Sequence, residues 1–234
     1  MNKKESKISA SLMCTNPFFT KETMDSLEKA NIEYMHLDIM DGKFVPNLGL
    51  GCDYIKKLRG YTKIPFDYHL MVLEPDAILP LLDIKPEDLV SIHFESTFQV
   101  QRTLENVKKY GPKVMLAINP ATPVSALEEV IHYIDGINIL TVNPGFAGQP
   151  IVESSFRKIE KLFNFLKEVG REDIDVEVDG NITFKNANIL KGMGANIFVA
   201  GTSSIFGKEG IIEGSIEKLR DAISGNSSVD KMIA

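Results

Sequence analysis

The chain has 234 residues, of which 44% are hydrophobic and 25% are charged, and its formal net charge is −6 at pH 7. This composition is ordinary for a globular protein, and the length suits one large domain or two small ones. The acidic balance argues against a nucleic-acid binder, because such a protein needs a basic face for its affinity. We also expect no membrane partner and no signal peptide, since no stretch approaches the roughly 20 apolar residues of a membrane-spanning helix.

Two cysteines, Cys14 and Cys52, are too few to form a disulfide framework. Disulfides persist in oxidising compartments, whereas reduced thiols are usual in the cytosol. We therefore interpret both residues as reduced thiols and predict a cytoplasmic protein.

In chain order, short apolar stretches typical of buried strands alternate with stretches of helical spacing. The polar tail at 225–234 is expected to be flexible. The predicted strands span residues 7–13, 34–42, 65–72, 89–95, 113–119, 136–143, 175–179 and 196–202. The predicted helices span residues 20–30, 51–58, 74–82, 100–110, 123–133, 154–169, 183–191 and 211–223.

Eight strand–helix units without a linker-like break predict an α/β protein that folds as a single domain over residues 1–234. Alternation of this kind implies a parallel sheet with right-handed crossovers. Eight units in this length favour a closed (β/α)8 TIM barrel over an open doubly wound sheet, although the periodicity alone is compatible with both. In a barrel, the chemistry gathers at the carboxyl ends of the strands.

The stretch 34–42 places His36 and Asp38 on one face of a strand whose other face is wholly apolar. An unpaired carboxylate in such a buried position would cost on the order of several kcal/mol. A divalent metal ion would remove this cost, because His and Asp are both ligands of Zn²⁺ and similar ions. A buried His–Asp hydrogen bond without a metal is the alternative, and this stretch alone favours neither.

Two further strands repeat the pattern. The stretch 65–72 places Asp67 and His69 on one face, and the stretch 175–180 brings Asp179 to the end of its strand. Four ligands, His36, Asp38, His69 and Asp179, converge if these three strands line one cavity. The sequence therefore predicts one divalent metal ion per chain, with Zn²⁺ the best match and Mn²⁺, Fe²⁺ and Co²⁺ as alternatives.

Glycine-containing loops follow each of the last three predicted strands. Glycines allow backbone N–H groups to approach an anion closely, and barrel phosphate sites are commonly built from loops after the seventh and eighth strands. Any one loop could be only a tight turn, but three adjacent loops favour a phosphate site. The predicted substrate-binding residues in these loops are Gly145, Phe146, Ala147, Gly148, Gly180, Asn181, Gly201, Thr202 and Ser203.

Five motifs resemble those of the ribulose-phosphate 3-epimerase family, with a match that runs from about residue 9 to residue 206. They are HLDIMDGKFVPN at 36–47, HLMV at 69–72, NPGFAGQ at 143–149, VDG at 178–180 and GTS at 201–203. The resemblance implies an isomerase that inverts C3 of a ketose phosphate through an enediolate, without a redox cofactor. It implies that His36, Asp38, His69 and Asp179 bind the metal. It also implies that Asp38 takes the C3 proton and Asp179 returns one.

Within this family the chain more closely resembles the D-allulose-6-phosphate 3-epimerases. Ribulose-5-phosphate enzymes usually carry Gly-Phe-Gly-Gly and Asp-Gly-Gly in the loops where this chain has Ala147 and Asn181. We therefore expect interconversion of D-allulose 6-phosphate and D-fructose 6-phosphate, with D-ribulose 5-phosphate to D-xylulose 5-phosphate as the alternative. We also expect a homo-oligomer.

Several inward-facing residues complete the predicted site. Ser11 matches a substrate-contacting position, His69 is expected to contact the substrate as well as the metal, and His93 is interpreted as a pocket hydrogen-bonder. A Schiff-base aldolase is disfavoured because no predicted strand has an interior lysine toward its carboxyl end, and a non-catalytic sugar-phosphate-binding barrel because both carboxylates are present. The residues expected to cap the reacting centre, with plain core packing as the alternative, are Met13, Met40 and Met71.

Overall fold

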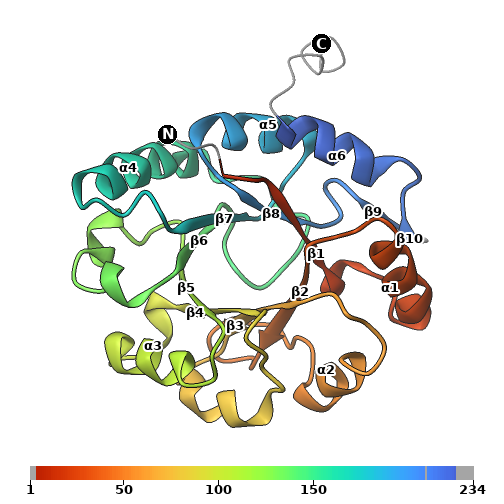
Figure 1. Cartoon of the computed structure of the whole chain (residues 1–234), viewed down its shortest axis with the longest axis horizontal. Coiled ribbons are helices and arrows are strands. Elements are labelled where there is room, and N and C mark those ends of the chain that lie inside the picture. The colour runs from red at the N-terminus through yellow and green to blue at the C-terminus, as the bar shows by residue number, and fades with distance from the viewer. Residues whose placement is uncertain (1–3, 209, 225–234) are drawn as a thin grey trace.

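Eight parallel strands close into a barrel in which each strand pairs with its neighbours in sequence (Figure 1). This computed structural model describes residues 4–208 and 210–224, so the predicted tail at 225–234 lies outside the described residues. The predicted (β/α)8 fold is confirmed. The strands are β1 (Lys7–Ser11), β2 (Tyr34–Met40), β3 (Phe66–Met71), β4 (Leu89–His93), β5 (Lys113–Ile118), β6 (Gly136–Leu140), β7 (Asp175–Asp179) and β8 (Ile197–Ala200).

Helices surround the barrel, and their apolar faces cover the outer faces of the strands (Figure 1). Thr183 caps the amino terminus of α5 by accepting a hydrogen bond from the N–H of Asn186. The α-helices are α1 (Thr20–Lys29), α2 (Cys52–Leu58), α3 (Val100–Lys108), α4 (Ser154–Glu168), α5 (Phe184–Met193) and α6 (Ser215–Ser224).

Three predicted helices differ from the structure. The segment 74–82 forms two short 3-10 helices, η3 (Pro75–Ala77) and η4 (Leu79–Leu81), because Pro80 lacks an N–H and its ring obstructs a continuous α-helix. The predicted helix at 211–223 begins only at Ser215, because a short hairpin formed by β9 (Phe206–Gly207) and β10 (Gly210–Ile211) precedes it. The segment 123–133 also forms 3-10 helices, η6 (Val124–Leu127) and η7 (Ile131–Tyr133).

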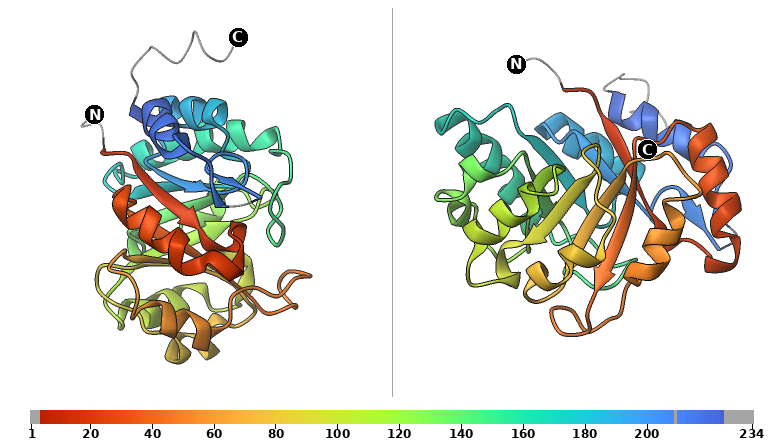
Figure 2. Two further views of the ribbon diagram at one scale, coloured as in Figure 1. Left: turned by 90° about the vertical axis from the view of Figure 1, so that its right-hand side faces the viewer. Right: turned by 60° about the horizontal axis from the view of Figure 1, so that its bottom comes forward.

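The barrel interior is closed at one end and open at the other. Side chains from the amino-terminal halves of four strands, Tyr34, Leu89, Met115 and Ile197, pack together inside the barrel. At the other end, the loops after β2 and β6 project in the same direction (Figure 2). Asn47 joins these two loops by donating its side-chain amide to the carbonyl of Gly145 over 2.7 Å. Among the described residues, the barrel interior therefore opens toward the carboxyl ends of the strands, where the active sites of this fold are found.

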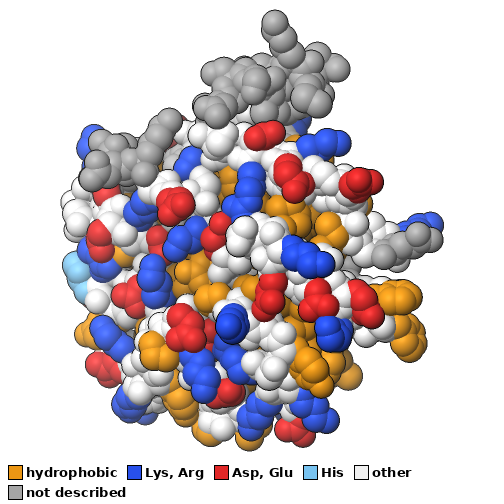
Figure 3. Space-filling model, turned by 45° about the vertical axis from the view of Figure 1, so that its right-hand side comes forward, with side chains coloured by type: hydrophobic (Ala, Val, Ile, Leu, Met, Phe, Trp, Pro, Cys, Tyr) orange, Lys and Arg blue, Asp and Glu red, His pale blue; other side chains and the backbone are white. Residues whose placement is uncertain are grey.

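On the face shown in Figure 3, acidic and basic side chains are interspersed and form no large patch of a single charge. Among the described residues, no helix combines the length and the apolar character that crossing a bilayer requires.

Candidate active site

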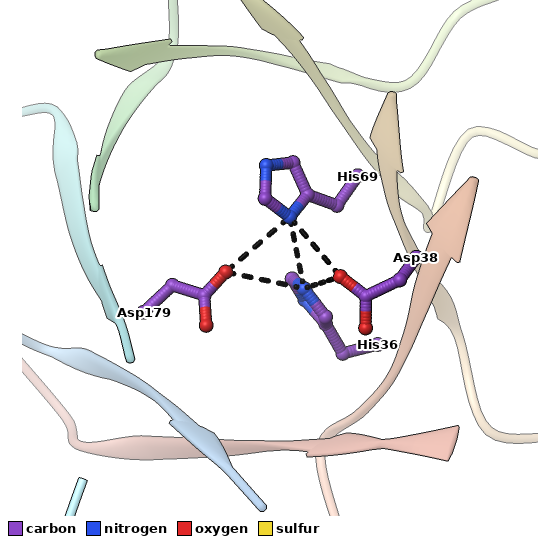
Figure 4. Close-up of side chains that lie close together, drawn as sticks. All are labelled: His36, Asp38, His69 and Asp179. Carbon is purple, nitrogen blue, oxygen red and sulfur yellow. Dashed lines mark hydrogen bonds and ion pairs between the residues drawn. The ribbon is translucent and has the colours of Figure 1, made fainter. Parts of the chain in front are cut away.

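Four side chains meet at the open end of the barrel, and we call them the metal cluster: His36 and Asp38 from β2, His69 from β3 and Asp179 from β7 (Figure 4). The in-register pairing of β2 with β3 sets Asp38 beside His69. Strand β7 lies across the barrel from β2 and β3 (Figure 1). Asp179 therefore faces the other three side chains from the opposite wall.

The spacing of the four ligand atoms suits a tetrahedral ion. His36 Nε2 lies 3.4 Å from Asp38 Oδ1 and 3.6 Å from Asp179 Oδ2. His69 Nδ1 lies 3.3 Å from each of the same two oxygens and 3.3 Å from His36 Nε2. Bonds of about 2.0–2.1 Å to zinc place tetrahedral ligands about 3.3–3.4 Å apart. The two-His, two-carboxylate set thus fits a Zn²⁺-sized divalent ion.

Without a cation, the histidines are the groups that balance the carboxylates of the metal cluster. Burial alone would lower the pKa of His36, but the charges of Asp67 and Asp38 outweigh it and raise that pKa well above its usual range. Burial would raise the pKa of Asp179, but hydrogen bonds to His36 and His69 lower it to about 2. The site therefore attracts positive charge, either as protons on the imidazoles or as a divalent ion.

Asp67 orients His36 from below the cluster. Its Oδ2 lies 2.6 Å from His36 Nδ1 and accepts a hydrogen bond from the hydroxyl of Ser9 over 2.7 Å. Burial would raise the pKa of Asp67, but the His36 charge outweighs it and keeps the pKa lowered, so Asp67 is an acceptor and His36 Nδ1 carries the hydrogen. A divalent ion that takes the place of the second imidazole proton would therefore bind His36 through Nε2.

Glu177 precedes Asp179 by two residues in β7, so both side chains lie on the same face of the strand. It is fully buried, with Oε1 3.7 Å from His36 Nδ1. Burial, and then the charge of Asp67, raises the pKa of Glu177 well above its usual range. The sequence analysis missed Glu177, although the alternation of Asp175, Glu177 and Asp179 along one strand was a usable signal.

His93 lies behind His69 rather than on the pocket wall. Its Nε2 is 2.8 Å from His69 Nε2, and the side chain is fully buried. Burial lowers the pKa of His93 to about 4, despite the opposing hydrogen bond with Glu95, so the ring is neutral. The sequence analysis also missed Glu95, which follows β4 in a 3-10 turn.

A pocket opens above the metal cluster toward the loops after β6, β7 and β8, and His36 lies beneath its floor. Ser11 donates its hydroxyl to Asp38 Oδ2 over 2.9 Å. Met13 belongs to the 3-10 turn Leu12–Cys14 rather than to β1, yet still reaches the pocket. The predicted site residues that line the pocket are Ser11, Met13, Asp38, Met40, His69, Met71, Gly145, Phe146, Ala147, Gly148, Asp179, Gly180, Asn181, Gly201, Thr202 and Ser203.

The far end of the pocket is formed by segments 143–149, 180–182 and 201–203, which we call the anion loops. Gly145 and Gly180 have φ angles of +116° and +110°, which side chains rarely adopt. The backbone N–H groups of Asn181 and Ser203 have no hydrogen-bond partner within the described part of the chain. None of the described residues that line the pocket is Lys or Arg, so a bound anion would be held there by neutral donors, the backbone N–H groups among them.

The side chain of Asn181 is engaged within the protein. It donates its amide to the carbonyl of Gln149 over 2.8 Å, and its oxygen accepts from Asn186 Nδ2 over 3.2 Å. Its φ of +50° is left-handed, a conformation that Asn tolerates better than most residues. The amide thus joins two of the anion loops to α5.

The fold and the site together define a barrel protein with a candidate metal centre at one end of its pocket and backbone-lined anion loops at the other. The sequence comparisons then specify the family. The family model described as the ribulose-phosphate 3 epimerase family matches residues 7–206. The chain belongs to this family, whose members are isomerase-class epimerases.

Curated relatives agree with this assignment, and a solved structure shares the fold. The chain is 39% identical to the ribulose-phosphate 3-epimerase of Escherichia coli (strain K12) over 76% of this chain and 78% of the relative. It is 34% identical to the Bacillus subtilis ribulose-phosphate 3-epimerase over 86% and 93%. The structure of 3-hexulose-6-phosphate synthase from Salmonella typhimurium has a TM-score of 0.65 at 12% identity, covering 93% of this chain and 98% of that one. That last similarity concerns the fold alone.

Proposed function

We propose that this chain epimerises C3 of a ketose phosphate by two-base proton transfer through an enediolate. The observation that supports this proposal most directly is the position of Asp38 and Asp179, which enter the metal cluster from opposite sides (Figure 4). Inversion of a carbon requires that a proton leave one face and arrive at the other, so the two bases must flank the substrate.

The C3 proton is acidic because it lies next to the C2 carbonyl, and its removal develops charge on the C2 oxygen. A divalent ion held by His36, Asp38, His69 and Asp179 would stabilise that charge as a Lewis acid. Asp38 takes the proton from C3 on one face, and Asp179 returns a proton to the other face. Asp179 must carry this proton in the substrate complex, although its pKa is lowered to about 2 in the free protein. In the reverse direction the two carboxyl groups exchange roles. Ser11 holds Asp38 in place through the 2.9 Å hydrogen bond to Oδ2.

The anion loops bind the substrate's phosphate in this proposal. The N–H groups of Asn181 and Ser203, which have no partner in the described part of the chain, supply donors without a lysine or arginine. Met13, Met40 and Met71 cover the reacting centre with apolar side chains and limit the access of water to the enediolate.

The substrate we favour is D-ribulose 5-phosphate, because relatives that are 34% and 39% identical are named ribulose-phosphate 3-epimerases. D-Allulose 6-phosphate, expected from the sequence, is the second candidate. Ala147 in the loop after β6 supports it. Asn181 supports it less than the sequence alone suggested, because its amide already bonds to Gln149 and Asn186 rather than standing free for an extra hydroxyl.

Zn²⁺ as the bound ion, a cytoplasmic location and a homo-oligomeric assembly are further parts of this proposal. Cys14 and Cys52 are both free thiols, which is compatible with a reducing compartment.

Two measurements test the proposed function. Epimerisation of ribulose 5-phosphate and allulose 6-phosphate should be compared by kcat/KM in one preparation, and the higher value identifies the preferred substrate. Incorporation of deuterium at C3 from heavy water should accompany turnover of that substrate. Binding of either sugar phosphate with neither epimerisation nor exchange would contradict the proposal and indicate a non-catalytic sugar-phosphate-binding barrel.

A further inference from the structure

A second line of hydrogen bonds leads away from the metal cluster on the side of β4. His69 Nε2, the nitrogen that faces away from the cluster, lies 2.8 Å from His93 Nε2. On the far side of the His93 ring, Nδ1 lies 3.3 Å from Glu95 Oε2. His69 and His93 are fully buried, so neither ring can exchange these contacts for water.

The direction of these hydrogen bonds follows from the atom that His69 offers to the cluster. His69 Nδ1 is the proposed ligand atom and must carry a lone pair, so the ring hydrogen sits on Nε2. That N–H donates to Nε2 of His93, which therefore accepts. The hydrogen of His93 must then sit on Nδ1, where it donates to Glu95.

Glu95 is held in place from its other side. Its Oε1 accepts from the backbone N–H of Asn119 over 2.9 Å and also from the hydroxyl of Thr122. The ring of Phe44, from the loop after β2, covers His93 at 4.7 Å between centroids. The carboxylate is thus anchored to the loop after β5, and the imidazole between it and His69 is fixed by packing.

We propose that His93 and Glu95 are positioning residues that hold His69 in the tautomer whose Nδ1 lone pair faces the metal. This inference rests on the proposed function, because it takes the metal cluster as the metal site. The two cluster histidines are then supported in different ways. Asp67 contacts His36 directly, whereas Glu95 acts on His69 through one intervening imidazole. Supports of this kind raise the basicity of the ligand and fix its orientation.

The wild-type protein by itself provides the first test. Zinc-loaded protein labelled with ¹⁵N in its histidines should show, in long-range ¹H–¹⁵N spectra, His69 protonated at Nε2 and His93 protonated at Nδ1. A His93 ring protonated at Nε2, or doubly protonated, would overturn the assignment without any substitution and independently of enzyme activity.

Substitutions provide the second test, with cobalt(II) as the probe. His93→Leu removes the acceptor for His69 and should weaken Co²⁺ binding about a hundredfold. Glu95→Gln removes the charge and one of the two acceptor oxygens but keeps the other, and should weaken binding about tenfold. His93→Gln should fall between wild type and His93→Leu, because its amide oxygen can still accept from His69. The matched controls are His132→Gln and Glu128→Gln, both on the exposed surface and remote from the pocket.

The readouts are the dissociation constant for Co²⁺ and the visible d–d spectrum of the loaded protein. A purely structural role for His93 would change thermal unfolding while leaving both unchanged. Dissociation constants equal to those of the controls would overturn the positioning role but leave the proposed function intact. Failure of the wild-type protein itself to bind Co²⁺ or Zn²⁺ would instead overturn the metal site.

Discussion

The two ends of the pocket are built in different ways. At the metal cluster, every interacting atom belongs to a side chain of a barrel strand. The supporting residues Asp67 and His93 are fully buried. At the anion loops, backbone N–H groups are available as donors, some of them beside glycines with positive φ. One end therefore depends on the chemical identity of a few residues, and the other on backbone conformation.

Substitutions at the two ends of the pocket should therefore have different effects. Loss of a ligand or base at the metal cluster removes a function that no neighbour can supply. A change in the anion loops shifts a backbone N–H donor slightly, which weakens its hydrogen bond to the phosphate and so lowers substrate affinity without abolishing it. Chemistry and substrate affinity should accordingly be separable by position in the pocket.

The largest effect is expected from the two proposed bases. Asp38→Asn and Asp179→Asn should each lower kcat by about 10²–10⁴-fold, the usual contribution of a positioned acid or base. Asp179→Asn should still exchange the C3 proton with heavy water, since exchange needs only the base on the Asp38 side. Epimerisation and exchange are both measured by NMR of the substrate. Normal epimerisation by both variants would show that the two-base assignment is wrong.

The second-largest effect is expected from loss of the metal ion. His36→Asn and His69→Asn are expected to reduce bound metal and activity together, because each removes one of the four proposed ligands. Metal analysis of the purified proteins and assays before and after chelation measure both quantities, with His132→Asn as the surface control. Full activity of a metal-free preparation would contradict the Lewis-acid role.

A smaller effect is expected at the anion loops. The Cβ of Gly145→Ala would lie 3.1 Å from the Cβ of Val45, at a φ of +116°. Strain of about 1–3 kcal/mol there should raise KM roughly tenfold to hundredfold while bound metal stays unchanged. Gly192→Ala, where a new Cβ meets nothing within 4 Å, is the matched control. A loss of metal in Gly145→Ala would show that the two ends are not separable.

The contribution of Glu95, which supports His69 through His93, should appear in the pH dependence of protein stability. Burial would raise the pKa of Glu95, but hydrogen bonds from His93, Thr122 and Asn119 lower it from 4.5 to about 2. A carboxyl group with a lowered folded-state pKa stabilises the protein above its unfolded-state pKa, and this stabilisation is lost as the pH falls. The free energy of unfolding of wild type should therefore exceed that of Glu95→Gln at pH 6, with the difference shrinking between pH 4.5 and 2. A pH-independent difference in chemical denaturation would argue against the lowered pKa.

The smallest effect is expected at the helix that follows the second anion loop. Thr183→Ala removes the side-chain acceptor for the N–H of Asn186 at the start of α5 and should destabilise the protein by about 1 kcal/mol. Thermal unfolding should show a decrease of about 2–4 °C, with little change in KM. Thr183→Ser keeps the hydroxyl and serves as the control. A large rise in KM would indicate that α5 positions the anion loop more strongly than the hydrogen bonds of Asn181 do.

Much of this protein is determined by local sequence. Alternation along β2, β3 and β7 assigned His36, Asp38, His69 and Asp179 to the inner faces of their strands, because side-chain direction in a strand depends only on the residue's own position. The glycines of the anion loops were equally visible, since positive φ is a local requirement. The alternation of eight strands with helices then favoured a closed barrel over an open sheet.

Other features were decided only in three dimensions. The contact of Asp67 with His36 depends on the register of β3 against β2, and the line from His69 through His93 to Glu95 crosses one further strand boundary, between β3 and β4. The role of Asn181 changed for the same reason, because its partner Gln149 comes from a loop 32 residues away in sequence. Periodicity reports which face a side chain occupies, but neighbours across strands and loops are set by register and closure, which no local pattern encodes.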